Sequence, residues 1–163
     1  MSWGHYSGDV KDFTSPVDIF RNARASAVMI GMDGRSFFRL RVSGVDKSAA
    51  GGTYGVHLHQ GPCVDGDSGA AALGHYNVTW DDIEGKIMGD VSKETEVWLD
   101  LKVDSGGVAR STATVSFIPE GKRSIVLHAA PTVSTADADG PAVGSAGARL
   151  ACLPFDINVY STS

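Results

Sequence analysis

The residues best suited to chemistry are two histidines, His57 and His59, in the run YGVHLHQGPC at positions 54–63. The run reads as a β-strand, in which alternate side chains lie on the same face. Both imidazoles would then project the same way from Cα atoms about 7 Å apart and could bind one metal ion, while Leu58 would point into a core. Two exposed histidines on a sheet face are the simpler interpretation, and both stay open at this point.

The other histidines bear on this choice. The chain has five, which are His5, His57, His59, His75 and His128. The last four lie in or beside apolar or glycine-rich segments, and this favours a shared site. His5 lies near the start of the chain, where we expect it on the surface.

Length and composition indicate one globular domain that is large enough for its own core. The chain has 163 residues, of which 42% are hydrophobic and 20% are charged, and its formal net charge is −5. The negative charge argues against a nucleic-acid-binding protein, which normally carries a basic patch. No apolar run approaches the ~20 residues of a membrane span. The oligomeric state is left open because no strand has the character of an interface.

The two cysteines, Cys63 and Cys152, do not form a Cys-x-x-Cys pattern. They are either one long-range disulfide or two separate buried thiols. A bridge would be worth about 4–5 kcal/mol in the chain-entropy model, and it would imply an oxidising compartment. The first residues lack the basic and apolar regions of a secretory signal.

The rest of the chain has an all-β pattern. We expect residues 1–23 to be an N-terminal extension and residues 24–163 to form the domain. No segment of helical length has a 3.6-residue period. Strands are predicted at residues 25–32, 36–42, 96–103, 108–117, 123–128 and 150–159, and around His57 and His59. Seven or eight such strands predict an antiparallel sandwich or barrel, and function is expected on its two long loops, 61–74 and 129–148.

Four segments of the chain resemble the copper/zinc superoxide dismutase family. They are GVHLH at 55–59, GHYN at 74–77, SIVLH at 124–128 and GSAGARLAC at 144–152. The last is the most specific, and the order and approximate spacing agree with the family from about residue 24 to residue 160. The resemblance implies an eight-stranded antiparallel Greek-key β-barrel, which agrees with the strand pattern.

The resemblance also implies a set of metal ligands. His57, His59 and His128 match the histidines that bind copper alone. His75 matches the histidine that bridges copper and zinc, and that takes up a proton on reduction and returns it to peroxide. Four imidazoles suit Cu(II) in a tetragonal field.

Two further features follow from the resemblance. Cys63 and Cys152 match the intrachain disulfide that pins the active-site loop to the barrel. Arg149 matches the arginine beside the copper, where a fixed positive charge attracts and orients the superoxide anion. The catalytic residues implied are therefore Arg149 and His75.

The chain departs from the family at the zinc site. The family has two more histidines and an aspartate after the bridging histidine, but no histidine occurs here between Tyr76 and Leu127. Carboxylates such as Asp81 and Asp82 would not replace two imidazoles. We therefore expect no zinc, and the chain resembles the copper-only branch of the family.

Without zinc, His75 lacks the group that would orient its ring. An alignment without gaps from the turn at 104–109 places Glu94 and Glu96 at the lost zinc positions. We expect Glu96, or else Glu94, to accept a hydrogen bond from His75. The alternative is that both glutamates are solvated charges at a strand edge.

The 129–148 loop departs from the family as well. It lacks the acidic residue that links the two metal sites, and Thr132 stands near that place. It also has no lysine or arginine. Attraction of superoxide is therefore expected to depend on Arg149, with help from Lys122 and Arg123.

These features predict copper-dependent dismutation of superoxide to oxygen and hydrogen peroxide, without zinc, in a secreted or periplasmic protein. An alternative is a copper storage or delivery protein on the same barrel. A third is a metal-free structural module, which retention of the histidines, the cysteines and the arginine argues against. Arg149 separates the first two, because a carrier has no evident need for a guanidinium at an open coordination position.

Overall fold

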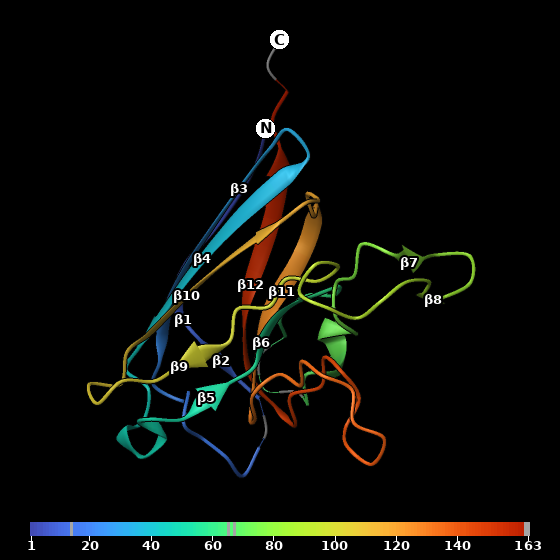
Figure 1. Ribbon diagram of the computed structural model, residues 1–163. Helices are drawn as coiled ribbons and strands as arrows, with labels where there is room; N and C mark the ends of the chain where they lie inside the picture. The colour runs from blue at the N-terminus through green and yellow to red at the C-terminus, as the bar shows by residue number, and fades with distance from the viewer. Residues whose placement is uncertain (14, 65, 67, 162–163) are drawn as a thin grey trace.

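One antiparallel sheet of eight strands curls into a half-barrel in the computed structural model, which describes residues 1–13, 15–64, 66 and 68–161 (Figure 1). Its long strands run in the order β10-β4-β3-β1-β12-β11-β6. Their bounds are β1 Ser2–Asp9, β3 Arg24–Met32, β4 Arg35–Ser43, β6 Val56–His59, β10 Ala109–Val115, β11 Gly121–His128 and β12 Arg149–Val159.

Shorter elements complete the fold. Strand β2 (Lys11–Asp12) pairs with β12. Two small sheets and two 3₁₀ turns lie beside the main sheet; they are β5 (Thr53–Tyr54) with β9 (Leu101–Lys102), β7 (Trp80–Asp81) with β8 (Lys86–Ile87), η1 (Lys47–Ala49) and η2 (Ala70–Ala72). Within the described part of the chain, no helix has the length and apolar character that crossing a membrane requires.

Alternation of buried and exposed residues explains the hairpin of β3 and β4. Every second residue of both strands is buried, and the strands pair in register from Arg24↔Ser43 to Met32↔Arg35. Asp33 and Gly34 join them with φ values of 53° and 75°. Two positive φ values match the type I′ turn, whose twist suits a β-hairpin. The predicted turn is confirmed.

The segment 96–103 fills the space between the outer strands β6 and β10. The backbone N–H of Leu99 donates to the carbonyl of Val56 (2.7 Å), and the hydroxyl of Ser111 donates to the carbonyl of Leu99 (2.7 Å). The segment was predicted as one strand, but only Leu101–Lys102 is regular strand. It nevertheless acts as the eighth member of the barrel.

The connections cross the sheet twice. The chain passes from β4, near one edge, to β6 at the other, and it returns from β10 at the first edge to β11 beside β6. This is a Greek-key arrangement. The prediction of an all-β, eight-stranded antiparallel Greek-key barrel is confirmed.

The prediction of an N-terminal extension at residues 1–23 is wrong. Strand β1 pairs with β3 from Ser2↔Gly31 to Asp9↔Arg24, and it also pairs with β12. The apolar alternation that marks a strand is hidden because Gly4 stands on its inner face. A Cβ at Gly4 would lie 2.8 Å from the ring of Phe155, so the ring takes the space that a side chain would fill.

The barrel interior is apolar and includes the fully buried Phe20, Phe38 and Phe155. Leu58 belongs to this core and is fully buried. Because strand side chains alternate, its neighbours His57 and His59 project from the other face of β6. The prediction for Leu58 is confirmed, and the histidines lie outside the barrel core.

A disulfide joins Cys63 to Cys152, whose sequence separation is 89. It ties the loop after β6 to the first half of β12. Cys152 is fully buried. Of the two interpretations that the sequence left open, the disulfide is therefore the one that the structure contains.

Replacement of the bridge by Cys63→Ser with Cys152→Ala should lower the free energy of unfolding by about 4–5 kcal/mol, because the unfolded chain regains the entropy of a long open loop. Urea unfolding of the double variant and of the wild-type protein measures the difference. Wild-type protein treated with reductant is the control and should unfold like the variant. A difference below about 1 kcal/mol would contradict this account.

Candidate metal centre

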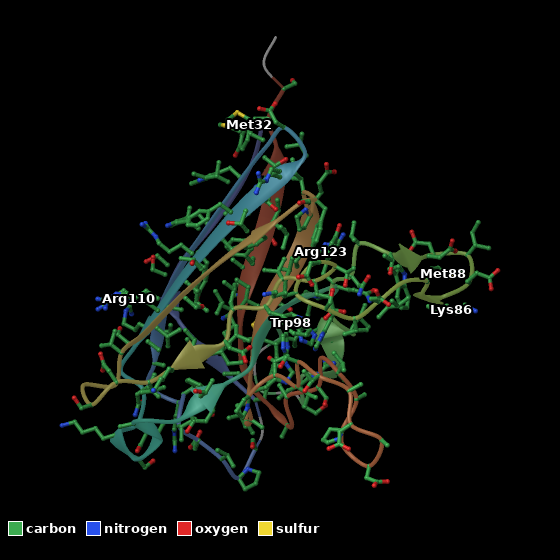
Figure 2. The ribbon with its side chains drawn as sticks, in the orientation of Figure 1. Met32, Lys86, Met88, Trp98, Arg110 and Arg123 are labelled. Atoms are coloured by element: carbon green, nitrogen blue, oxygen red, sulfur yellow. A yellow bond between two sulfur atoms is a disulfide. The ribbon has the colours of Figure 1, made fainter. Side chains whose placement is uncertain are left out.

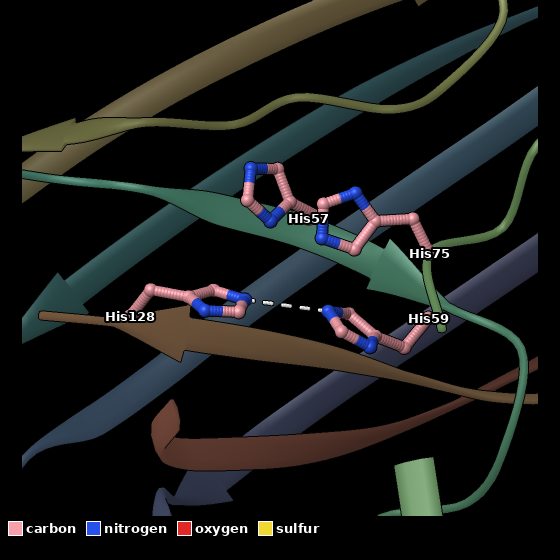
Figure 3. A group of neighbouring side chains, drawn as sticks. All are labelled: His57, His59, His75 and His128. Atoms are coloured by element: carbon pink, nitrogen blue, oxygen red, sulfur yellow. Dashed lines mark hydrogen bonds between the residues drawn. The ribbon is translucent and has the colours of Figure 1, made fainter. Parts of the chain in front are cut away.

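Four histidines from three segments meet on the outer side of β6 (Figure 3). Strand β6 supplies His57 and His59, and the end of β11 supplies His128. His75 follows the 61–74 loop and is held by an isolated backbone bridge to His59. The two strands pair with each other, so the barrel itself fixes three of the four imidazoles.

The four rings converge on one point. One ligand atom from each of His57, His59, His75 and His128 lies within 4.8 Å of all the others. Three of these residues are buried, with exposed fractions of 0%, 0% and 4% for His57, His59 and His128. The side chain of His75 is 18% exposed. The site therefore opens to solvent at His75.

Backbone carbonyls fix the ring orientation of two of the histidines. Nδ1 of His59 lies 3.0 Å from the carbonyl oxygen of Leu73, and Nδ1 of His128 lies 3.3 Å from that of Gly147. A carbonyl only accepts, so both Nδ1 atoms carry the proton and both Nε2 atoms keep a lone pair. The two Nε2 atoms face each other at 3.3 Å (Figure 3). Two facing lone pairs repel each other unless a cation lies between them.

A threonine and an aspartate orient His57. The hydroxyl of Thr132 donates to Oδ1 of Asp100 (2.5 Å), so its oxygen accepts from Nε2–H of His57 (2.7 Å). The backbone N–H of Thr132 also donates to Asp100 (2.9 Å). Nδ1 of His57 then keeps its lone pair, and this buried atom has no hydrogen-bond partner among the described residues.

A buried carboxylate orients His75. Oε1 of Glu96 accepts from Nδ1–H of His75 (2.8 Å), and Glu96 is only 1% exposed. Nε1 of Trp98 donates to the same oxygen (3.0 Å), and Nδ2 of Asn77 donates to Oε2 (2.8 Å). Burial raises the pKa of Glu96, but these hydrogen bonds outweigh it and lower the pKa overall.

Of the two glutamates that the sequence suggested, the structure places Glu96 on His75. Glu94 is exposed, and its backbone N–H donates to the hydroxyl of Ser92 (3.2 Å). The interpretation as a solvated edge charge therefore applies to Glu94 alone. Alternation alone would place Glu94 on the same face as Glu96, but Glu94 lies in the turn at 93–95, which the backbone N–H of Thr95 closes on the carbonyl of Ser92 (3.2 Å).

The buried imidazoles are neutral near pH 7. Burial lowers the pKa of His57 far below its usual value, lowers that of His59 to about 2 and lowers that of His128 to about 4. The charge that His75 would carry lowers all three further, and so does Arg149. A neutral imidazole is the form that binds a metal ion.

Arg149 lies beside these histidines as the first residue of β12 and the register partner of His128. Its Nη1 donates to the carbonyl of Gly69 (2.7 Å), and the side chain is half-buried. Gly69 belongs to the 61–74 loop, which the disulfide ties to the same strand. The loop and the strand thus hold a fixed positive charge next to the imidazoles.

Arg123 was expected to help Arg149 attract an anion. Its Nη1 donates to the carbonyl of Gln60 (2.9 Å), and its guanidinium lies 4.9 Å from the centre of the Tyr76 ring (Figure 2). It is therefore held against the residue that follows His75. Lys122, the other cation expected to help, is exposed.

The donor set fits a metal ion. Four inward lone pairs, on Nδ1 of His57 and on Nε2 of His59, His75 and His128, surround one point, and each outer nitrogen is already hydrogen-bonded. Hydrogen bonds of this kind raise the basicity of metal-binding histidines and fix their tautomers. The four-histidine group could hold a metal ion.

Sequence reasoning missed part of this site. It placed Thr132 near the position of a family carboxylate, but it did not find Asp100, Asn77 or Trp98. A signal was present for two of them, because Trp98 and Asp100 alternate with the apolar Val97, Leu99 and Leu101 and so belong to the face turned away from the core. Only the fold shows that this face meets the histidines.

No protein-family model matches the chain, and no curated protein matches it. A fold by itself does not fix an activity. What this chain does must therefore be argued from the four histidines and the groups around them.

The metal-free protein should lose stability as the pH falls below about 6.5. His57, His59 and His128 have lower pKa values in the folded chain than in the unfolded chain, so the unfolded chain binds more protons in this range. Each of them should cost about 1.4 kcal/mol per pH unit between its two pKa values. Urea unfolding with a chelator between about pH 7 and pH 5 measures the slope.

Two variants identify the source of that slope. His128→Gln should reduce the slope of the unfolding free energy against pH by the equivalent of about one bound proton. His5→Gln, on the exposed face of β1, should leave the slope unchanged. The lowered pKa of Glu96 affects stability only at lower pH, because its unfolded value is about 4.3. Constant stability between about pH 7 and pH 5 would contradict a site of buried neutral histidines.

Proposed function

We propose that this chain is a copper-only superoxide dismutase, in which His57, His59, His75 and His128 bind a single copper ion without zinc. One observation carries the proposal: four neutral imidazoles converge beside the anchored guanidinium of Arg149. The imidazoles would hold the metal, and the guanidinium would receive a small anion next to it.

The donor atoms favour copper over zinc. Nitrogen ligands bind Cu(II) more tightly than any other divalent ion of the first transition row. A second metal ion would need the outer nitrogen of His75, but this Nδ1 donates to Glu96. The carboxylate of Glu96 thus occupies the side of His75 on which a bridging histidine would bind zinc. This supports a site with one metal.

Copper, when bound, supplies a one-electron couple, so that one superoxide is oxidised to oxygen and a second is reduced, with two protons, to hydrogen peroxide. The protein supplies binding, orientation and protons. Arg149 attracts each anion and holds it beside the imidazoles, because its guanidinium is fixed by the carbonyl of Gly69.

His75 is the residue best placed to hold and deliver a proton. Its Nε2 faces the centre, and its 18% exposure lets it exchange protons with water. Glu96 keeps the proton on Nδ1, so Nε2 is the atom that gains and loses one. The carboxylate would also keep the ring in this orientation while Nε2 carries a proton.

The disulfide supports the proposed compartment. Bonds such as Cys63–Cys152 persist in secreted and periplasmic proteins and are rare in a reducing cytosol. The bond also holds the loop whose Gly69 carbonyl anchors Arg149. We therefore propose a secreted or periplasmic location, where the bond that supports the site is stable.

Loading with copper should give about one copper and no zinc per chain, together with dismutation of superoxide. His57→Ala should lose both copper and activity, because it removes a ligand that β6 fixes. Arg149→Ala should keep its copper but lose about tenfold or more in turnover, since it removes the charge that attracts the anion. Metal analysis and a superoxide assay measure both quantities.

These measurements also distinguish a copper-dependent dismutase from a copper storage or delivery protein. One bound copper without turnover would support a storage or delivery protein and contradict the dismutase. Activity that persists in His57→Ala would refute the site itself. His5→Ala is the matched control, because it removes an exposed histidine from β1 and should change neither copper content nor turnover.

Glu96→Gln should weaken copper binding by about 10- to 100-fold, because the ring of His75 loses its anionic acceptor. Glu94→Gln is the matched control and should have no effect, since Glu94 is exposed. Competition with a chelator of known affinity gives the binding constants. Equal affinity in the Glu96 variant and the wild type would rule out this role for the carboxylate.

A further inference from the structure

The outer face of β3, β4 and β10 is strongly basic. These three strands contain five arginines and no aspartate or glutamate, although the whole chain has a net charge of −5. All five arginines are exposed. They are Arg24, Arg35, Arg39, Arg41 and Arg110.

Four of these arginines form no ion pair with the described residues. The fifth, Arg24, pairs with Asp9 on β1 at 2.7 Å. Arg41 and Arg110 are direct register partners. Like charges in this position destabilise a sheet, so a ligand that neutralises them would remove this cost.

The arginines surround a hollow. A space of about 530 Å³ lies among Arg39, Arg41 and Arg110, and the hydroxyl residues Ser26 and Thr112 also line it. Guanidinium and hydroxyl groups together suit phosphate or sulfate oxygens. The hollow therefore indicates an oxyanion as the group bound here.

A row of large apolar side chains continues the same face. Trp3, Ile30 and Phe37 are neighbours across β1, β3 and β4, and they are 41%, 46% and 43% exposed. Met32 lies at the hairpin end of the face and Arg110 toward its other end (Figure 2). Contiguous exposed apolar residues of this kind mark an interaction surface.

We infer that this arginine face, made of Arg35, Arg39, Arg41, Arg110, Ile30 and Phe37, docks on an anionic lipid membrane. The guanidiniums bind the headgroup phosphates. The apolar side chains enter the boundary between headgroups and acyl chains, as on other surfaces that lie on a membrane. One occupant then accounts for both the arginines that form no ion pair with the described residues and the exposed apolar row.

Other occupants account for only one of these features. A sulfated polysaccharide would neutralise the arginines but leave Ile30 and Phe37 exposed. A second copy of the face would bring arginine against arginine, since β3, β4 and β10 have no carboxylate to offer. The membrane is the occupant whose charge and polarity both complement the face.

The histidine site stays open in this arrangement. With the segment 96–103 closing the barrel, β3 lies opposite β6, and three members of the barrel separate them in either direction. His57 and His59 project outward from β6 (Figure 3). Docking through β3 and β4 therefore turns the histidine site away from the lipid.

Vesicle flotation tests the docking. The protein should bind vesicles of mixed phosphatidylcholine and phosphatidylglycerol, and high salt should weaken the binding. It should not bind phosphatidylcholine alone. Arg39→Gln with Arg41→Gln and Arg110→Gln should lower the affinity about 100-fold, from about 1 kcal/mol for each arginine. The control Lys47→Gln with Lys86→Gln and Lys102→Gln removes the same charge from other exposed positions and should bind like the wild type.

A second variant tests the apolar row. Ile30→Thr with Phe37→Thr should weaken binding to the mixed vesicles, most clearly at high salt, and circular dichroism should show that the fold is retained. Equal binding by the arginine variant and its lysine control would overturn the inference. Binding to a sulfated polysaccharide but not to vesicles would also overturn it, as would a dimer that either face variant dissociates.

Discussion

The outer hydrogen bond of each imidazole is the interaction on which the site depends. Four rings can share one point only if they are neutral and if every inner nitrogen carries a lone pair. Backbone carbonyls accept the outer hydrogen bonds of His59 and His128. The hydroxyl of Thr132 accepts that of His57, and the carboxylate of Glu96 accepts that of His75. Each acceptor fixes a tautomer, so the inner atoms are ready to bind before any ion arrives.

The acceptors come from the irregular parts of the barrel. One face of the segment 96–103 carries Glu96, Trp98 and Asp100, which bond to the site or to groups that support it. The long loops do the same with backbone carbonyls. The disulfide then holds one of these loops, and with it the guanidinium of Arg149, against β12.

Local pattern was a good guide wherever one face of a strand is apolar, as in the hairpin of β3 and β4 and in Leu58 between two histidines. It failed at β1, where Gly4 leaves room for the ring of Phe155 and so removes the apolar period. It also failed at Asp100, because a polar residue within a strand does not show what it faces. Glu96 was found only through a resemblance, and Glu94 stayed open as the second choice until burial separated them.

The sequence by itself determined the β architecture, the pair of imidazoles on one face of β6, and the number of ligands available, because period-2 alternation and residue type are local properties. Tertiary structure decided which partners those residues meet. The pairing of Cys63 with Cys152 and the path from His57 through Thr132 to Asp100 join residues that lie far apart in the chain. Such contacts arise from the closure of the barrel, which no local pattern encodes.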